Sequence, residues 1–545
     1  MASSSLDKPL QVPSSRFKAR PLDLPLLKLT FIALGMQIIY VTYIVAFPLI
    51  SNTQAGGPAA DLEILMRDYR WFAPLYTLGI LLLYFLFWQA MKIVLAGRWQ
   101  VEGNPEAHIS PPLPHLASPA HTAIEPDRPD RMLKLFILVF GLVFGFTLVW
   151  LYPITANDLF RYVIRGRVWA IYDESPLISP PSEFPDDPYL AFAGEFEELA
   201  SGYGPLWELL VQVPLRLGAT DMIPAVIGLK LIILLCYLGC AILIGWFAIP
   251  EKSSSLAALT FFAWNPLILM QALGNGHNDM VFLALLVLGI VCWQRGLWWA
   301  AAFALTLSAL AKAPAAMILP LFAVILLREE TTWSQRLLKA LAMGLIGLIT
   351  VYLVYAAFGP VNETMDGLSN TVSLSRRGGF SIAAGLRMVL REIIPVEVAE
   401  TLPRTTGRYI FLIFYAGLLL QLWRHKFNLV TAGFLVFFSQ LILWRTFRIW
   451  YPTWLIPLAA IHLTPATFWR TTLLGLTAEL SLINYFVVWR WGLRDLPWEK
   501  LGLVTTNYYW TVMHVLTVPW VFGLPLFGPI IMNWVQQRKS SPKPS

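Results

Sequence analysis

The sequence predicts an all-α, polytopic integral membrane protein, and two features of its composition support this fold class. Of the 545 residues, 57% are hydrophobic and only 13% are charged, whereas about 25% of a typical soluble domain is charged. The apolar residues also form long runs, which are Leu26–Ile50, Phe72–Lys92, Met132–Ile154, Ile223–Phe247 and Gly344–Phe358. Each run approaches the roughly 20 residues that a helix needs to cross about 30 Å of hydrocarbon.

The distribution of lysine and arginine orients the first helices, because these residues gather in cytoplasmic loops. The N-terminal tail is rich in them, with Lys8, Arg16, Lys18, Arg20 and Lys28. It is therefore expected in the cytoplasm, followed by a retained first helix, since no small-residue cleavage site ends the first apolar run. The second apolar run is then expected to cross back to the cytoplasm, where the proline-rich segment 101–131 forms a loop. The third run crosses outward and ends on the extracytoplasmic side. Asp158 emerges there.

The number of crossings depends on two ambiguous stretches. Tyr203–Leu217 is short and contains two prolines, so it either crosses the membrane or re-enters it. Trp298–Leu327 is either one long helix or two short ones interrupted near Lys312 and Pro314. If Tyr203–Leu217 re-enters the membrane and Trp298–Leu327 is broken into two helices, most of the remaining lysines and arginines lie in the cytoplasm. This choice predicts about 12 to 15 transmembrane helices, with amphipathic or juxtamembrane helices on the outer face.

These boundaries divide the chain into six segments. They are a cytoplasmic tail (1–25), a transmembrane hairpin with its cytoplasmic loop (26–131), a transmembrane core (132–358) with the outer loop 155–202, a second outer loop (359–405), C-terminal transmembrane helices (406–535) and a cytoplasmic tail (536–545). Both termini are thus expected in the cytoplasm of a multi-pass protein of the cell membrane, and the polar outer loops on its extracytoplasmic side.

Several function classes are not expected from the sequence. The net charge of +7 does not predict nucleic-acid binding, because no basic run interleaved with aromatic residues lies in a soluble segment. No Walker loop, dinucleotide-binding glycine pattern or His-Glu-x-x-His motif occurs, so ATP-driven transport and zincin proteolysis are not expected. The three cysteines, Cys236, Cys240 and Cys292, lie in apolar stretches without accompanying histidine or carboxylate, which predicts neither a metal site nor a disulfide.

The first candidate site is Asn157-Asp-Leu-Phe-Arg-Tyr, followed by Arg165-Gly-Arg. On a helix, one face would carry Asp158, Arg161, Tyr162 and Arg165. This pattern is either a salt-bridged interfacial helix or a catalytic carboxylate flanked by phosphate-binding cations. A second motif, Ser201–Trp207, contains Tyr203 between glycines and is typical of a chain that re-enters the membrane.

The third candidate combines Trp264-Asn265-Pro266-Leu267 with Gly274–Asp279. Polar residues are costly between apolar stretches and often mark a ligand path, although glycine and asparagine also form plain turns. His277, Asn278 and Asp279 are candidates to bind sugar hydroxyls.

Several cations form the last group of candidates. Lys312, alone in an apolar stretch, either reaches the membrane interface or pairs with an anion. The chosen topology also places four arginines outside, against the usual charge bias, and these are Arg376, Arg377, Arg445 and Arg448. Such arginines either contact lipid headgroups or bind an anionic substrate.

In combination, these motifs resemble the GT-C superfamily of glycosyltransferases, which use polyprenyl-phosphate sugars as donors. Within it, the chain is similar to the actinobacterial α-(1→6)-mannopyranosyltransferases. The motifs are Asn-Asp-Leu-Phe-Arg-Tyr after an outward helix, Tyr203-Gly-Pro-Leu-Trp, and Asn265-Pro-Leu with Gly276-His-Asn-Asp. The resemblance covers roughly residues 130 to 320, and extends to the C-terminal half only in hydropathy.

The resemblance implies a transfer of a sugar, mannose first, from a polyprenyl-phosphate donor to a glycan or glycolipid of the cell envelope, with inversion at the anomeric carbon. Asp158 would act as general base on the acceptor hydroxyl. The leaving phosphate would be met by cations, for which the candidates are Arg161, Arg165, Lys312, Arg376 and Arg377. The sugar or acceptor would contact polar and aromatic side chains, namely Tyr162, Tyr203, Asn265, His277, Asn278 and Asp279.

Two questions stay open at this point. Many relatives carry a second acidic residue in this loop, often linked to a divalent metal, whereas this chain has Asn157 there, so a metal-independent enzyme without a cofactor is expected. The donor carries mannose, arabinose or glucose, and the same mechanism would serve all three sugars. A lipid or sugar transporter is the alternative from another class, although the inverted repeat that many transporters carry is not visible around Asn265–Asp279.

Overall fold

The computed structural model describes residues 23–53, 59, 65, 71–96, 128–249, 252–360, 362–364, 380–444, 446–484 and 506–540. Every regular element within these ranges is a helix, and the only strand-like pairing among them is an isolated bridge between Pro48 and Leu151. The predicted all-α fold is therefore confirmed.

Seven helices in the described ranges are long and apolar enough to cross a membrane. They are α1 (Asp23–Ala46), α4 (Phe72–Val94), α5 (Arg128–Val149), α8 (Met222–Ile242) with its extension η5 (Leu243–Phe247), α13 (Trp333–Ala356), α16 (Val396–Trp423) and α20 (Thr506–Ser540). An eighth span is formed if α9 (Lys252–Ala263) and the π-helical η6 (Ile268–Gly274), which meet at a 50° bend, are counted together.

Shorter apolar helices fill the rest of the bundle. They are α10 (Asp279–Gln294), α11 (Trp298–Ala311), η7 (Ala313–Met317) with α12 (Ile318–Arg328), α17 (Leu429–Leu443), and η8 (Tyr451–Trp454) with α18 (Leu455–Ile461). The helix α19 (Pro465–Ile483) packs beside α20. Because the shorter helices do not qualify as spans by length, the expectation of 12 to 15 crossings stays a prediction.

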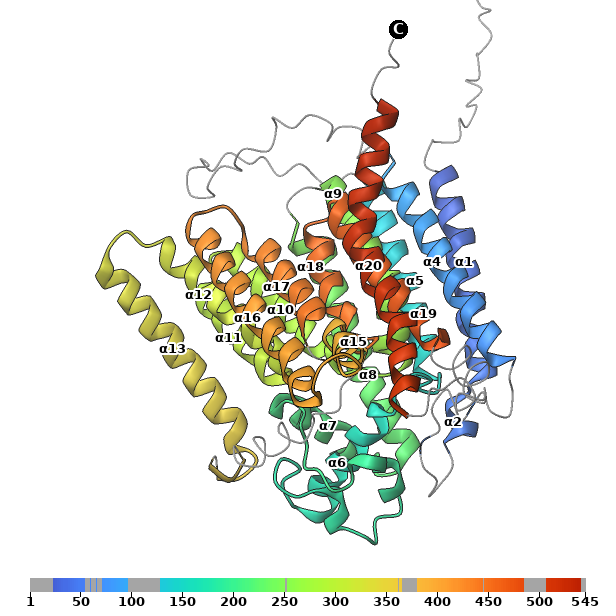
Figure 1. Cartoon of the computed structure of the whole chain (residues 1–545), viewed down its shortest axis with the longest axis vertical. Helices are drawn as coiled ribbons and strands as arrows, with labels where there is room; N and C mark the ends of the chain where they lie inside the picture. Colours follow the sequence, from blue (N-terminus) through green and yellow to red (C-terminus); the bar gives the residue numbers. More distant parts are fainter. Residues whose placement is uncertain are drawn as a thin grey trace, which may run out of the picture.

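The helices stand side by side, and one end of the bundle carries the polar segment that follows α5 (Figure 1). This end holds α6 (Asp158–Tyr172) and α7 (Pro205–Arg216), with two short 3-10 turns between them, η3 (Pro181–Glu183) and η4 (Leu190–Phe196). The N-terminal end of α1 and the C-terminal end of α20 lie at the opposite end of the bundle (Figure 1). These two helix ends thus lie at the far end of the bundle from α6, while the side of the membrane that each end faces stays a prediction.

Neither ambiguous stretch forms one continuous helix long enough to cross the membrane. The first becomes α7, whose 12 residues extend about 18 Å and fall short of the hydrocarbon thickness. The second is broken: α11 ends at Ala311, and Lys312 is extended, with φ −155° and ψ 125°. Pro314 lies in the first turn of the next element, where its missing amide hydrogen breaks no hydrogen bond. The break therefore places Lys312 at the end of a helix.

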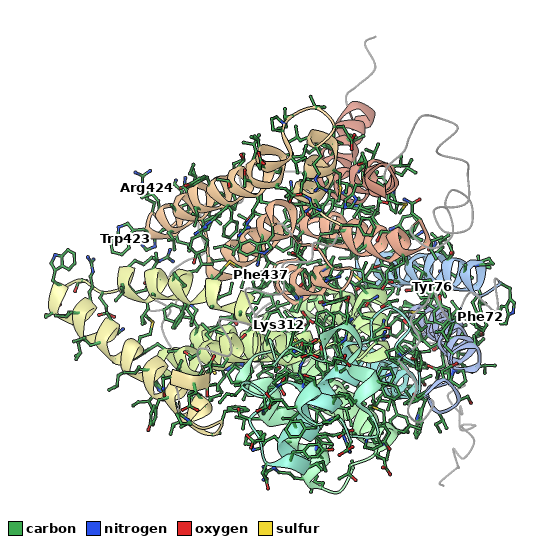
Figure 2. All side chains as sticks on the ribbon, turned by 60° about the horizontal axis from the view of Figure 1, so that its bottom comes forward. Phe72, Tyr76, Lys312, Trp423, Arg424 and Phe437 are labelled. Atoms are coloured by element: carbon green, nitrogen blue, oxygen red, sulfur yellow. The ribbon has the colours of Figure 1, made fainter. Side chains whose placement is uncertain are left out.

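A buried network joins the N-terminal hairpin and the C-terminal helices to the centre of the bundle. The Tyr76 hydroxyl of α4 donates to Glu479 Oε2 of α19 at 2.6 Å, and Gln271 Nε2 of η6 donates to Glu479 Oε1 at 2.8 Å. Figure 2 shows Tyr76 toward the edge of the molecule and Lys312 near its middle. Helices far apart in the sequence thus share a polar contact in the interior of the bundle.

Candidate active site

The first residue of α6 is Asp158, and its side chain points along the predicted polar face. Arg161, one turn later, lies with Nη1 3.1 Å from Asp158 Oδ1. The side chain of Asp158 is 15% exposed and that of Arg161 is 19% exposed. A carboxylate at this position is stabilised by the positive end of the helix dipole. The predicted helix and the pairing on its face are therefore present.

His277 approaches Asp158 from the loop between η6 and α10. Its Nδ1 lies 3.8 Å from Asp158 Oδ2, and its ring stacks on Trp450 with centroids 3.9 Å apart. Both ring nitrogens are buried without a hydrogen-bond partner among the described residues. Two nitrogens left unpaired beside a carboxylate are available to a bound hydroxyl compound.

Gly276 allows this loop to lie against α6. Its φ is +74°, a conformation that favours glycine. A Cβ at this position would lie 2.7 Å from Leu159 Cδ2, which is closer than two carbon atoms approach. The glycine of the Gly-His-Asn-Asp motif thus brings His277 and Asp158 together.

Asp279 and Lys312 form the second charged pair of the site. Lys312 Nζ lies 2.7 Å from Asp279 Oδ2 and 3.2 Å from Asn278 Oδ1, and the Trp454 indole N–H donates to the other Asp279 oxygen. The Asp279 side chain is 1% exposed and that of Lys312 18%. A carboxylate this deeply buried requires partners, and it has two. Lys312 therefore pairs with an anion of the protein while its side chain stays partly exposed.

The charges around Asp158 favour its ionised form. Burial alone raises the pKa of Asp158, but positive neighbours lower it by more, so the pKa lies below the ordinary value of an aspartate. In order of effect these neighbours are protonated His277, Arg161, Arg448 and Lys312. Burial lowers the pKa of His277 to about 4, although Asp158 and Asp279 act to raise it. At neutral pH the site thus contains an ionised Asp158 and a neutral His277.

Aromatic rings cover the other side of Asp158. Tyr162 of α6 meets Tyr203 and Trp207 edge-on, with centroids 4.7 Å and 5.0 Å away. Burial and then the charge of Asp158 raise the pKa of Tyr203, so this phenol stays protonated. Arg165 lies over the Tyr203 ring at 5.4 Å and is 5% exposed. Tyr162, Tyr203 and Arg165 thus group with Asp158 as predicted.

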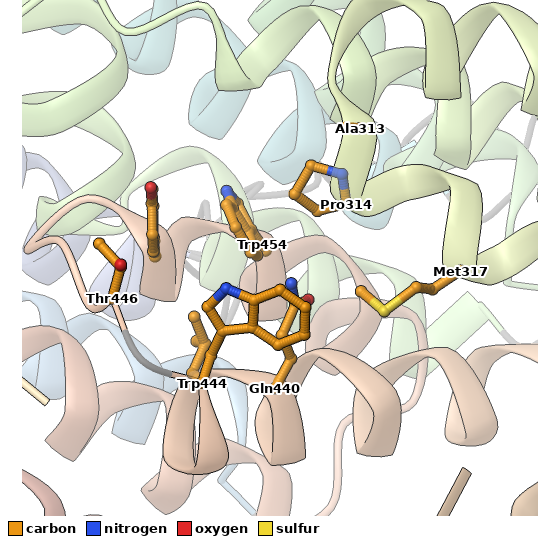
Figure 3. A pocket seen from close by; sticks show the side chains of 9 residues that line it. Ala313, Pro314, Met317, Gln440, Trp444, Thr446 and Trp454 are labelled. Carbon is orange, nitrogen blue, oxygen red and sulfur yellow. The ribbon is translucent and has the colours of Figure 1, made fainter. Parts of the chain in front are cut away.

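A cavity of about 280 Å³ opens next to Lys312. Figure 3 shows Pro314 and Met317 on one side of it, with Trp444 and Gln440 on the other. The rings of Tyr451 and Trp454 also line it, and Lys312 Nζ lies 5.8 Å and 6.0 Å from their centroids. A cationic group therefore stands at the edge of a mainly apolar, aromatic-lined cavity.

The side chain of one predicted residue, Asn265, makes a local hydrogen bond. The Asn265 side-chain oxygen accepts from the Leu267 amide at 3.1 Å, a bond that stabilises the turn between α9 and η6. Arg376 and Arg377 fall outside the described residues.

The segment from Arg448 to Trp454 belongs to the site, although only Arg448 was a candidate from the sequence, as an arginine that contacts headgroups or binds an anion. Arg448 acts on both Asp158 and His277, Trp450 stacks on His277, and Trp454 binds Asp279. The one signal in the sequence was the unexpected pair of arginines beside three tryptophans. Among the described residues, no three histidine, cysteine, aspartate or glutamate side chains are grouped to hold a metal ion.

Comparison with known proteins assigns the region that carries most of these residues. Residues 130–328 match the sequence profile of the family described as alpha-(1->6)-mannopyranosyltransferase, N-terminal domain. The match covers a little over a third of the chain. The resemblance predicted from the motifs is therefore confirmed.

A curated relative supports the same assignment. Alpha-(1->6)-mannopyranosyltransferase A of Mycobacterium tuberculosis is 24% identical to this chain, over a match that covers 48% of the chain and 56% of the relative. The match therefore spans about half of each protein. Asp158, His277, Asp279 and Lys312 lie within the residues that match the family profile, whereas Arg448–Trp454 lies beyond them.

Proposed function

We propose that this chain is a membrane mannosyltransferase that moves mannose from a polyprenyl-phosphate donor to a glycan or glycolipid of the cell envelope. The observation that carries the proposal is the placement of one ionised carboxylate, Asp158, within a group of cations that borders an apolar cavity. The family domain at residues 130–328 supports mannose as the transferred sugar. The reaction takes place on the extracytoplasmic side, at the end of the bundle opposite the termini.

Asp158 serves as the general base. Its carboxylate takes the proton of an acceptor hydroxyl while that oxygen forms a bond to the anomeric carbon. The bond from this carbon to the phosphate oxygen breaks, and its electron pair leaves with polyprenyl phosphate. Attack opposite the leaving group inverts the anomeric carbon. The low pKa of Asp158 keeps the base ionised at neutral pH.

The cations receive the departing phosphate. Arg161, Lys312 and Arg448 surround two carboxylates, Asp158 and Asp279, so that one positive charge is in excess when His277 is neutral. This excess favours a dianionic phosphate as it separates from the sugar. Arg165 and the predicted Arg376 and Arg377 are further candidates for the same role. The cavity beside Lys312 accommodates the first part of the prenyl chain against Trp444, Tyr451 and Trp454.

Unpaired polar groups provide contacts for the sugar. The nitrogens of His277 and Nδ2 of Asn278 are buried without partners among the described residues, and sugar hydroxyls would satisfy them. Tyr162 and Tyr203 offer aromatic surface next to Asp158. In this arrangement Asp158 reaches the acceptor oxygen, whereas His277 and Asn278 hold the donor sugar.

The test is sugar transfer by the purified full-length chain in lipid nanodiscs, with polyprenyl-phosphate mannose as donor and a mannan oligosaccharide as acceptor. Asp158→Asn is expected to lose about 100-fold or more of kcat, the scale of general-base catalysis. The matched control is Asp130→Asn, which removes a carboxylate paired with Lys134 at 3.1 Å on α5, and it is expected to retain activity.

Two outcomes would overturn the proposal. Full activity of Asp158→Asn would remove the assigned base. Transfer only from polyprenyl-phosphate arabinose or glucose would refute mannose, and transfer from none of the three donors would refute the enzyme.

A further inference from the structure

Lys230 of α8 is fully buried in the bundle, and no carboxylate pairs with it in the described part of the chain. Its ammonium group instead donates to three backbone carbonyls. They belong to Leu148 at 3.1 Å, Gly274 at 2.7 Å and Leu151. Burying a charge is costly unless it is paired and hydrogen-bonded, so this arrangement requires compensation from the carbonyl groups.

The three carbonyls come from the ends of two helices. Leu148 lies in the last turn of α5, Leu151 lies two residues beyond its end, and Gly274 is the last residue of η6. The C-terminal end of a helix carries the equivalent of about half a negative charge. Two such ends therefore offset much of the charge of one ammonium group. Lys230 thus adds a hydrogen-bond donor at both helix ends, where the last carbonyls have no partner within the helix.

Both helix ends lead directly to the active site. The chain runs from α5 through residues 150–157 to Asp158, and from η6 through Asn275 and Gly276 to His277. The two connections are also joined to each other: the Thr155 amide donates to Asn275 Oδ1 at 3.0 Å, and the Thr155 hydroxyl to Gln271 Oε1 at 3.1 Å. The position of Asp158 relative to His277 thus depends on the point where Lys230 holds the two helices.

We propose that Lys230 is a positioning residue for the transfer reaction, which ties together the two segments that present Asp158 and His277. It acts through the backbone and does not touch the substrates. The inference rests on the proposed function for its effect on turnover, whereas the effect on the two segments is independent of that function.

The experiment compares wild type with Lys230→Met and Lys230→Gln in nanodiscs. Loss of the ammonium group is expected to lower kcat about 10- to 100-fold, because a displacement of about 1 Å at a reacting pair costs this much. The KM for the donor is expected to change less than kcat, since the cations and the cavity still bind the phosphate and the prenyl chain. Backbone hydrogen exchange is expected to accelerate in peptides covering 150–158 and 274–279.

Tyr237→Phe is the matched control. Tyr237 lies on the same helix, is fully buried, and donates to a single backbone carbonyl, that of Ala263, away from Asp158. Its loss is expected to leave kcat within about 3-fold of wild type, at a stability cost of about 1 kcal/mol for one hydrogen bond. A general loss of packing would instead slow both variants alike.

Unchanged kcat and unchanged exchange in the folded Lys230 variants would overturn the proposal, and so would an equal fall of kcat in Tyr237→Phe. If neither Lys230 variant folds, the residue is required for the fold itself and the positioning role is refuted. Failure of the proposed function is distinguishable, because wild type would then show no transfer while the exchange comparison still reports on the two segments.

Discussion

The imidazole of His277 lies nearly parallel to the indole of Trp450, with the ring planes 19° apart and the centroids separated by 3.9 Å. The side chain of His277 is 2% exposed, and its Nδ1 lies 3.8 Å from Asp158 Oδ2. Such an environment disfavours the protonated form, which agrees with the pKa of about 4. His277 is therefore suited to exchange hydrogen bonds with a sugar and not to bind the phosphate as a cation.

The low pKa of His277 predicts a loss of stability in acid. Above about pH 6.5, the ordinary pKa of histidine, the ring is neutral in both the folded and the unfolded chain. Between that pH and about 4, the unfolded chain binds a proton that the folded chain does not, so the free energy of unfolding falls as the pH falls. The full difference amounts to about 3 kcal/mol below the folded pKa.

His277→Asn removes this contribution. The Tm of each protein is measured in the same detergent at about pH 7.5 and about pH 4.5. The drop in Tm from the higher to the lower pH is expected to be larger for wild type than for the variant. The control is His425→Asn, at an exposed helix end, whose drop is expected to match that of wild type. An equal drop in all three proteins would contradict the buried, neutral histidine.

Lys312 is expected to serve both the fold and the phosphate, and a pair of variants separates the two roles. Lys312→Met leaves Asp279 buried with only the Trp454 indole as partner, and is expected to destabilise the protein by about 3–5 kcal/mol and to abolish transfer. The double variant Lys312→Met/Asp279→Asn removes the uncompensated charge. It is expected to regain most of the Tm but none of the activity, because the cation for the leaving group is still missing.

Recovery of transfer in the double variant would show that Lys312 matters only for pairing with Asp279. The matched control is Lys339→Met, which removes a lysine paired with Glu330 away from the site. It is expected to change neither transfer nor Tm by a measurable amount, since ion pairs near the surface contribute little.

Local patterns in the sequence were sufficient for part of the site. The spacing of Asp158 and Arg161 predicted their shared helix face, and Pro314 predicted the helix break at Lys312. Such features depend on residues within one or two turns of each other, and the periodicity of a helix determines them. The same is true of the fold class, because the length of an apolar run determines whether a helix can cross the membrane.

Contacts between distant segments were not predictable in this way. Trp450 and Trp454 lie about 170 residues from the side chains that they touch, and tryptophan near a membrane interface is common without any site. Lys230 was one charge within an apolar run, and its partners are carbonyl groups, which every residue possesses. Asn265 was predicted to contact the sugar or acceptor, and the one side-chain contact described for it, from the Leu267 amide, is explained by the local turn.

Gly276 provides a sharp test of how closely Asp158 and His277 must approach, because Gly296 has nearly the same backbone angle. The φ values are +74° and +75°, yet a Cβ at Gly276 would meet Leu159, whereas a Cβ at Gly296 would meet no atom within 4 Å. The positive φ destabilises both alanine variants by the same amount, about 1 kcal/mol. Only Gly276→Ala is expected to push α6 away from the loop, and with it Asp158 away from His277.

The expected result is therefore a difference in activity at similar backbone strain. Gly296→Ala should transfer sugar at the wild-type rate with a slightly lower Tm, and Gly276→Ala should lose about 10- to 100-fold of kcat. Leu159→Ala in the Gly276→Ala background makes room for the added methyl group and is expected to restore part of that loss. Equal activity of the two glycine variants would show that turnover tolerates a wider separation of Asp158 from His277.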